Sequence, residues 1–325
     1  MTLLAAIPRS ATLVLSPDDP APVAARAAVR FHLRVFAAAE EAARVGDTEP
    51  IHRLRVSTRR LRAALSLFGP LLPARFVDAA QRELTWLASS IGAVRDLDVL
   101  AEAVQERAAE IDPALRAALG PVGATIQDRR AAAHDALIEV LGSSRCLRLV
   151  ERLTAFAESA PRVRDVPPLG QVAPDLVRPL QRAVVRAGRR LAPESQAAEF
   201  HRLRVRVKRL RYGLEPLRGF GVPTVQRLLR RLERLQDVLG AAQDAATQMA
   251  WLHAYARGPD VPTASLLPVG AIIQALSRRA TKRSRRALRA WRKLSGGRLL
   301  DGLAADLARA SHDRRSGSEQ EVVGQ

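Results

Sequence analysis

The feature that most constrains this chain is a segment that occurs twice, about 149 residues apart. Residues 51–56 read Ile-His-Arg-Leu-Arg-Val, and residues 200–205 read Phe-His-Arg-Leu-Arg-Val. The match continues from 59–62 to 208–211, and then from Leu87, Gly92 and Asp96 to Leu235, Gly240 and Asp244. Solenoid repeats span about 20–50 residues, far less than this unit. The sequence therefore predicts an internal duplication of one bundle rather than an array of small repeats.

Each half is predicted to be entirely helical, because Ala, Leu and Arg dominate and no alternating β-branched run occurs. The predicted helices cover 22–45, 49–68, 73–110, 113–141 and 145–158 in the first half, and 172–191, 195–218, 222–257, 265–294 and 297–310 in the second. The predicted organisation is an irregular arm (1–21), a first bundle (22–160), a Pro-rich linker (161–171), a second bundle (172–310) and a flexible tail (311–325).

The hydropathy pattern gives no sign of a membrane segment. No uncharged apolar run reaches the roughly 18 residues that a transmembrane helix needs, and the apolar start lacks the basic region of a signal peptide. A cytoplasmic protein without membrane insertion is therefore expected. The single cysteine, Cys146, excludes a disulfide scaffold and a cysteine-based zinc site.

The charge balance points to a polyanionic partner. Lys and Arg number 52 against 33 Asp and Glu, so the formal net charge is +19 and many cations lack an internal acidic partner. Lys208, Lys282 and Lys293 are the only lysines, and arginine suits phosphate because its planar fork donates two parallel hydrogen bonds and stays protonated. Nucleic acid, an acidic membrane surface and a phosphate polymer all fit this balance.

The repeated segment has an apolar face and a basic face. At about 100° per residue, Leu54, Leu61 and Leu65 share one side of the first copy, which indicates a buried face. Elsewhere on the helix runs a basic stripe, His52, Arg55, Arg59 and Arg62, which recurs as His201, Arg204, Lys208 and Arg211. Cations stacked about 6 Å apart repel by roughly 3 kcal/mol at an effective dielectric near 20. Such a row is unfavourable unless an anion lies along it.

A basic helix face is more often a solvated surface whose charges pair with carboxylates of a neighbouring helix. Three observations favour a bound anion here: the stripe occurs twice, the acids are too few to neutralise the cations, and further basic stripes exist. The further stripes are Arg26/Arg30/Arg34, Arg178/Arg182/Arg186/Arg189, Arg227/Arg230/Arg231/Arg234 and Arg278/Lys282/Arg285/Arg289. We therefore expect these stripes to bind a polyanion.

The histidines that begin the two stripes are candidate phosphate ligands. His52 and His201 each lie one turn before an arginine, so each can add a donor to phosphate, more strongly when protonated. A metal site is not expected, because no HExxH motif occurs, cysteine is absent nearby and the surroundings are cationic.

In each copy an acid follows a glycine, Asp96 after Gly92 and Asp244 after Gly240. We expect the small residues to allow close helix approach, and each acid to support the site by holding an arginine of the stripe in one rotamer. Catalysis would need paired carboxylates or a metal with them, and the second copy has Ala246 where the first has Asp98.

Signatures of catalysis and of base recognition are missing from the sequence. There is no phosphate-binding P-loop, no Gly-x-Gly-x-x-Gly and no serine elbow. The aromatic residues, 4% of the chain, leave few platforms on which unpaired bases could stack. The sequence thus predicts a protein that is not an enzyme, takes no cofactor and contacts phosphate groups alone.

Residues 52–62, followed by Gly92 and Arg95-Asp96-Leu97-Asp98, resemble the CHAD family, the conserved histidine α-helical domain. Residues 201–211, with Gly240 and Asp244, resemble the second half of that family, although Lys208 replaces an arginine and Gln243 stands where the first copy has Arg95. The resemblance covers roughly residues 22–310. It implies two four-helix bundles related by a pseudo-twofold axis, with a basic channel or cleft between them. It also implies binding of inorganic polyphosphate and association with polyphosphate granules. The triphosphate-tunnel (CYTH) domain fused to many relatives is not recognisable, so hydrolysis is not implied.

The leading hypothesis is non-catalytic polyphosphate binding along the basic stripes. The first alternative is a protein that binds the phosphate backbone of nucleic acid, and the second is a hydrolase in which Asp96 and Asp98 recruit Mg²⁺. The candidate binding residues are His52, Arg55, Arg59, Arg62, His201, Arg204, Lys208, Arg211, Arg30, Arg34, Arg182, Arg186, Arg278 and Lys282, supported by Asp96 and Asp244.

Overall fold

The computed structural model describes residues 12–161 and 166–323, and every regular element within them is a helix. The first half contains α1 (Ala21–Ala43), α2 (Thr48–Phe68), α3 (Ala74–Ala108), α4 (Pro113–Arg116), α5 (Gly120–Gly142) and α6 (Ser144–Glu158). The second half contains α7 (Leu169–Arg189), α8 (Ala197–Leu214), α9 (Pro223–Ala256), α10 (Thr263–Ser295), α11 (Arg298–Asp301) and α12 (Leu303–Val323). Short 3-10 turns lie at η1 (Gly69–Leu71), η2 (Ala117–Leu119) and η3 (Glu215–Phe220). The predicted all-α fold class is confirmed.

The helices that carry the basic stripes begin at well-defined turns. Before α2 the chain reverses through Gly46, whose φ of 95° lies in the left-handed region that glycine adopts without strain. Before α8, Gln196 and Glu199 form a capping box, and the Gln196 backbone N–H donates to the Glu199 carboxylate at 2.9 Å. These turns determine at which residue α2 and α8 begin, and so they position the basic stripe on each helix.

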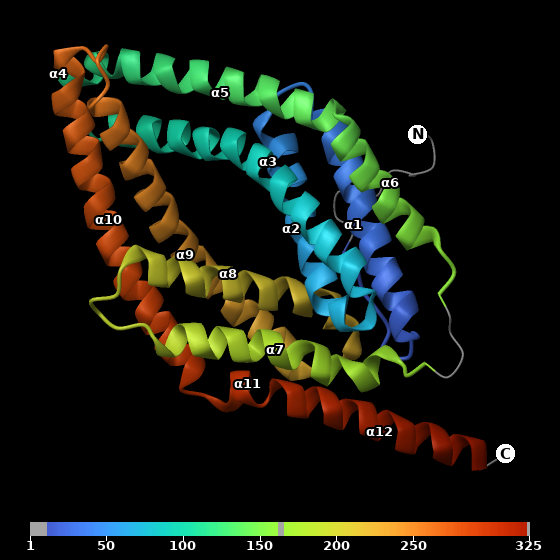
Figure 1. The fold of residues 1–325 in the computed structure, drawn as a ribbon. Coiled ribbons are helices and arrows are strands. Elements are labelled where there is room, and N and C mark those ends of the chain that lie inside the picture. The colour runs from blue at the N-terminus through green and yellow to red at the C-terminus, as the bar shows by residue number, and fades with distance from the viewer. Residues whose placement is uncertain (1–11, 162–165, 324–325) are drawn as a thin grey trace.

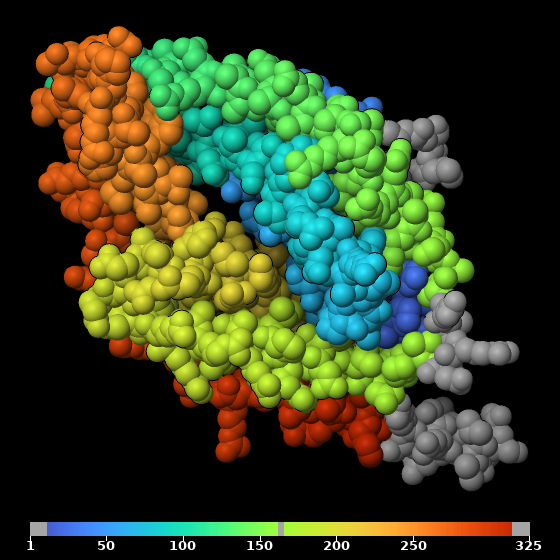
Figure 2. Space-filling model, in the orientation of Figure 1, coloured from blue at the N-terminus to red at the C-terminus, as the bar shows by residue number. Residues whose placement is uncertain are grey.

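The long helices form the sides of a ring (Figure 1). Helix α3 packs along α5, α9 along α10, and α8 along both α7 and α9, while α1 and α2 close the side between α3 and α8. Helices of 33 to 35 residues are about 50 Å long, so α3, α9 and α10 span most of the molecule. Figure 2 shows a hollow in the middle of this face, between α3, α8 and α9.

Three apolar clusters hold the ring together. The first-half core joins α1, α2, α3, α5 and α6. The second-half core joins α7–α12 and also takes in Ala24 and Ala28 of α1 and Phe68 of α2. The third, which we call the tip core, joins the end of the α3–α5 pair in the first half to the end of the α9–α10 pair in the second half, and it includes Val104 and Leu252. Apolar contacts therefore connect the halves at both ends of the central hollow.

Several predicted boundaries differ from the structure. Helix α7 begins at Leu169, within the predicted linker, and α12 continues through Val323, although a flexible tail was expected from residue 311. The described part of the N-terminal arm docks on the second half: the Leu15 backbone N–H donates to the Pro216 carbonyl at 3.0 Å, and Leu15 is buried. The Pro17 carbonyl likewise accepts from Gly170. Residues 1–11 and 162–165 lie outside the described residues.

Among the helices described, none combines the length and the apolar character needed to cross a bilayer.

Candidate functional site

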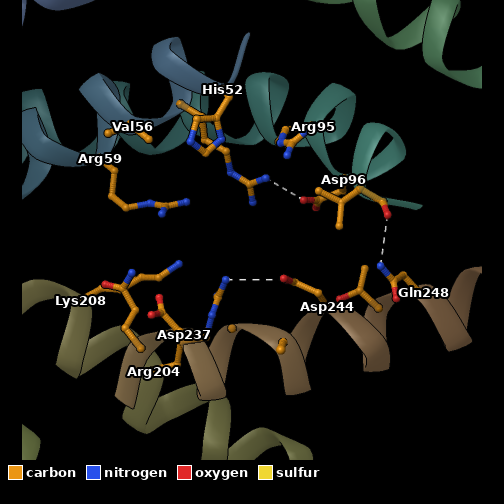
Figure 3. A pocket seen from close by; sticks show the side chains of 16 residues that line it. His52, Val56, Arg59, Arg95, Asp96, Arg204, Lys208, Asp237, Asp244 and Gln248 are labelled. Carbon is orange, nitrogen blue, oxygen red and sulfur yellow. Dashed lines mark hydrogen bonds and ion pairs between the residues drawn. The ribbon is translucent and has the colours of Figure 1, made fainter. Parts of the chain in front are cut away.

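The two repeated basic stripes contribute to one cavity of about 420 Å³ between the halves. In Figure 3, α2 and α3 form one wall of this cavity and α8 and α9 form the opposite wall. The lining residues are His52, Arg55, Val56, Arg59, Arg95, Asp96, Val99, Arg204, Lys208, Gln236, Asp237, Gly240, Ala241, Asp244, Thr247 and Gln248. The two copies of the repeat therefore share a site, which we call the central cavity.

Cations extend into the central cavity from both walls. Arg59 of α2 and Lys208 of α8 extend toward one another (Figure 3). Burial, together with Arg59, Arg204 and Arg55, lowers the pKa of Lys208 to about 6. Burial also lowers the pKa of Arg204, although arginine stays protonated at any physiological pH. The fold thus places basic side chains where both desolvation and mutual repulsion oppose their protonated, charged forms.

In each copy of the repeat, the aspartate lies beside an arginine of the basic stripe, as expected from the sequence. Arg55 donates to Asp96 at 2.9 Å, and the corresponding Arg204 lies 3.9 Å from Asp244. Burial raises the pKa of Asp244, even though Arg204 and Lys208 act in the opposite direction. With Asp237, the lining carries three acids against five Lys and Arg side chains. Its formal charge is therefore positive.

A small hollow of about 150 Å³ extends the central cavity between α2 and α8. The two spaces share Arg59, Arg204 and Lys208, and the small hollow adds Arg62 and Arg209. Burial lowers the pKa of both added arginines, with Arg209 and Arg59 as further causes at Arg62. The positive surface therefore continues toward this end of the stripes.

On the other side, a hollow of about 480 Å³ extends the central cavity toward α10. Val99, Ala241, Asp244 and Gln248 line both spaces. The new lining includes the cations Arg279, Lys282, Arg283 and Arg286 and the acids Glu102 and Glu106. The three adjoining spaces make a basic path that begins between α2 and α8 and reaches α10.

The two histidines of the repeat have different surroundings. His52 lines the central cavity, where burial and then Arg95 lower its pKa. His201 is exposed on α8, and its Nδ1 lies 2.9 Å from the Gln243 side-chain oxygen. Gln243 occupies the position that corresponds to Arg95, so the second copy replaces a cation beside histidine with a hydrogen-bonding amide. His52 faces the site, and His201 does not line it.

Several predicted binding residues lie outside these hollows. Arg30 donates to the Ala157 carbonyl at 2.5 Å, because its side of α1 packs on α6. Arg211 pairs with Glu215 at 3.0 Å and Glu233 at 3.2 Å. The other predicted residues outside the cavity path are Arg34 on α1, Arg182 and Arg186 on the exposed surface of α7, and Arg278 on α10. Helical spacing placed them on basic faces but could not show which faces look inward.

The structure also adds residues that the sequence reasoning missed. Arg95 lines the central cavity, but the corresponding residue in the second copy, Gln243, does not. Because comparison of the two copies indicates only charges present in both, Arg95 was not predicted as a binding residue. Arg279, Arg283 and Arg286 lie on the face of α10 adjacent to the predicted 278/282/285/289 stripe. Their spacing of four and three residues is typical of one helix face, so a second basic face on this helix could have been predicted from the sequence.

The expected role of the repeated glycines was wrong. A Cβ added at Gly92 or Gly240 would meet nothing within 4 Å, so neither position serves a close helix contact. Gly240 instead lines the central cavity.

The two neighbouring acids of α3 have separate roles. Asp96 is exposed at the cavity, whereas the Asp98 side chain is only 3% exposed and accepts from Arg130 at 2.7 Å. Arg130 also donates to the Gly46 carbonyl, so this pair, with Asp98 buried and Arg130 largely so, joins α3, α5 and the α1–α2 turn. In the chain as described, no three His, Cys, Asp or Glu side chains gather in a metal-binding arrangement.

Comparison with known proteins gives a consistent family match. The family model described as "CHAD domain" matches residues 27–253. The crystal structure of the CHAD domain from the plant Ricinus communis is similar with a TM-score of 0.70 at 26% identity, covering 88% of this chain and 97% of that one. The structure of PptA from Streptomyces chartreusis has a TM-score of 0.68 at 20% identity, covering 84% and 100%, and shows likeness of fold. No curated protein gives a significant match.

Proposed function

This chain belongs to the CHAD domain family, and on that premise we propose that it binds inorganic polyphosphate in the central cavity. The observation that carries the proposal is the pair of facing basic walls, with Arg59 and Lys208 directed into one space. A linear polyanion between these walls would relieve the repulsion and offer acceptors to both. Charge-assisted hydrogen bonds from arginine to phosphate oxygens are among the stronger protein contacts.

The shape of the cavity favours a phosphate chain over a duplex. At about 420 Å³, with extensions of about 150 and 480 Å³, the path has the capacity of a few tens of water molecules. A flexible string of phosphates fits in that space, but a duplex with its bases does not. Among the described residues, the only aromatic rings in the lining are the His52 imidazole and Tyr212 in the small hollow, so stacking with unpaired bases has little support.

We further propose that binding is not coupled to hydrolysis. The Mg²⁺-dependent alternative needs Asp96 and Asp98 to converge, but Arg130 engages Asp98 in a buried pair. Association with polyphosphate granules in the cytoplasm would follow from binding alone.

Two adjacent arginines of α2 provide the test. Arg59 lines the central cavity without a carboxylate partner among the described residues, whereas Arg60 pairs with Glu215 at 3.3 Å and lines none of the hollows. Arg59→Gln and Arg60→Gln therefore remove the same charge from the same helix. We expect Arg59→Gln to weaken long-chain polyphosphate binding about tenfold, the effect of one or two charge-assisted hydrogen bonds. Arg60→Gln should change the affinity less than about twofold.

The affinities are measured by titration calorimetry at several salt concentrations. The comparison ligands are tripolyphosphate and a duplex DNA whose total charge matches that of the long-chain polyphosphate. Preference for polyphosphate over DNA, together with a loss confined to Arg59→Gln, supports the proposal. Equal affinity for DNA, or equal loss in both variants, overturns it.

A further inference from the structure

The middle of α10 is a strongly basic and exposed segment. Residues 277–286 read Ser-Arg-Arg-Ala-Thr-Lys-Arg-Ser-Arg-Arg, and none of them is buried. They connect Leu276 in the tip core to Ala287 and Leu288 in the second-half core. Within the stretch, Ala280 packs against the tip core and is only partly buried. Within the described residues, Arg279 is the one cation of the stretch with a carboxylate partner, Glu110 at 3.5 Å.

The cations of this stretch lie on two adjoining faces of the helix. Arg279, Arg283 and Arg286 face the hollow that extends the central cavity. Arg278, Arg285 and Arg289 line a different, open hollow of about 520 Å³ along the exposed side of α10, which we call the outer groove; all of its lining residues belong to this one helix. Helical geometry puts the two faces about a quarter-turn apart. Lys282 lines both hollows and therefore lies where the two faces meet.

The outer groove is polar throughout. Besides its four cations it is lined by Ser277 and Thr281, and the Thr281 hydroxyl donates to the Ser277 carbonyl at 3.1 Å. Among the described residues, no carboxylate lines it. From Arg278 to Arg289 the cations extend along about 16 Å of helix at intervals of three and four residues. Like charges at this spacing destabilise a helix, so the row is unfavourable without an external anion.

We propose that the outer groove continues the polyphosphate site: a long chain leaves the central cavity over Lys282 and lies along Arg278, Arg285 and Arg289. This inference rests on the proposed function and deepens it. A chain that fits within the central cavity uses the inner cations alone, and a longer chain also engages the outer row. Affinity should then rise with chain length beyond the capacity of the cavity.

The test replaces the three outer arginines by glutamine and leaves Lys282 in place, because Lys282 also borders the inner path. The matched control replaces Arg75, Arg148 and Arg152, which are exposed on α3 and α6 and line none of the four hollows. Both triple variants lose the same net charge. Circular dichroism and thermal unfolding establish that each variant folds.

Long-chain polyphosphate should bind the outer-groove variant at least tenfold more weakly at about 0.1 M salt, and its log–log salt slope should fall by about two to three, near the value for three lost phosphate contacts. Tripolyphosphate affinity should stay within about twofold, because the central cavity is intact. The control variant should keep the long-chain affinity within about threefold, since distant surface charges are screened.

Three outcomes would overturn the inference. One is an outer-groove variant that matches the control with long chains, and another is an equal loss for tripolyphosphate. The third is loss of duplex DNA binding with polyphosphate binding retained, which assigns the groove to nucleic acid. Failure of the wild-type protein to prefer polyphosphate over DNA would instead contradict the proposed function, so the two failures are distinguishable.

Discussion

Lys208 is the side chain whose charge should change most when a polyanion enters the central cavity. Its amine is partly buried beside three cations, Arg55 and Arg59 from α2 and Arg204 from its own helix, and Asp244 of α9 is the nearby acid that offsets them. These surroundings lower its pKa from the usual 10.5 to about 6, with burial as the largest cause. A bound polyanion reverses the local sign of the field and favours the ammonium form.

The size of the effect follows from the pKa of about 6. At pH 7.5 the free protein carries Lys208 about 97% neutral, so binding should take up close to one proton at this residue. At pH 5 Lys208 is already about 90% protonated, and its uptake should fall to roughly 0.1 proton. Each pH unit above 6 should then weaken binding about tenfold, until the pKa of the bound state is reached.

Calorimetry in buffers of different ionisation enthalpy measures this uptake directly. The matched variant is Lys208→Arg, because its guanidinium stays charged across the whole range. At pH 7.5 the wild type should take up close to one proton on binding, and the variant should take up about one proton fewer. The affinity of the variant should also change little between pH 6 and pH 8. His52 contributes at lower pH, because burial and Arg95 lower its pKa, and this contribution remains in both proteins. Equal uptake by wild type and variant at pH 7.5 would refute the reasoning.

Three further predictions concern stability. The pKa of Lys208 is about 6 in the folded protein and its ordinary value is 10.5, so between these values the unfolded chain binds one proton more than the folded protein, and wild-type stability should rise with pH. The amount by which the melting temperature of Lys208→Met exceeds that of the wild type should therefore shrink between pH 6 and pH 10. A constant difference would contradict this. Asp98→Asn breaks the buried pair with Arg130 and should cost about 3 kcal/mol in denaturant unfolding, while a loss below about 1 kcal/mol would show the pair to be dispensable. Gly188→Ala places a Cβ into the buried indole of Trp291 and should cost about 1–3 kcal/mol by thermal melting, whereas Gly92→Ala, which has open space, should be neutral or stabilising.

Most of the helical framework was predictable because helix signals are local. Alanine, leucine and arginine content set the element type, and Gly46 and the prolines marked the turns. The end of the chain was predicted less well: its polar composition indicated a flexible tail, but α12 continues through it. The duplication itself remains a prediction from the repeat.

The binding face was predictable only in part, because helical spacing gives a face but not its neighbour. The inner half of each stripe, from Arg55 to Arg59 and from Arg204 to Lys208, does line the central cavity. Arg211 belongs to the same stripe yet pairs with two glutamates. Such outcomes depend on which helices meet across the ring, and that is decided by packing between segments far apart in the sequence.

The tip core has a consequence for how quickly the site can act. Since Val104 and Leu252 belong to an apolar cluster at one end, and Ala28 and Phe68 to another at the opposite end, apolar packing at both ends opposes separation of the two basic walls when the cavity is empty. The receptor is then preorganised, so little conformational ordering has to accompany capture. Encounter with a polyanion should therefore be limited by diffusion in an attractive field, with association rates that fall steeply as ionic strength increases.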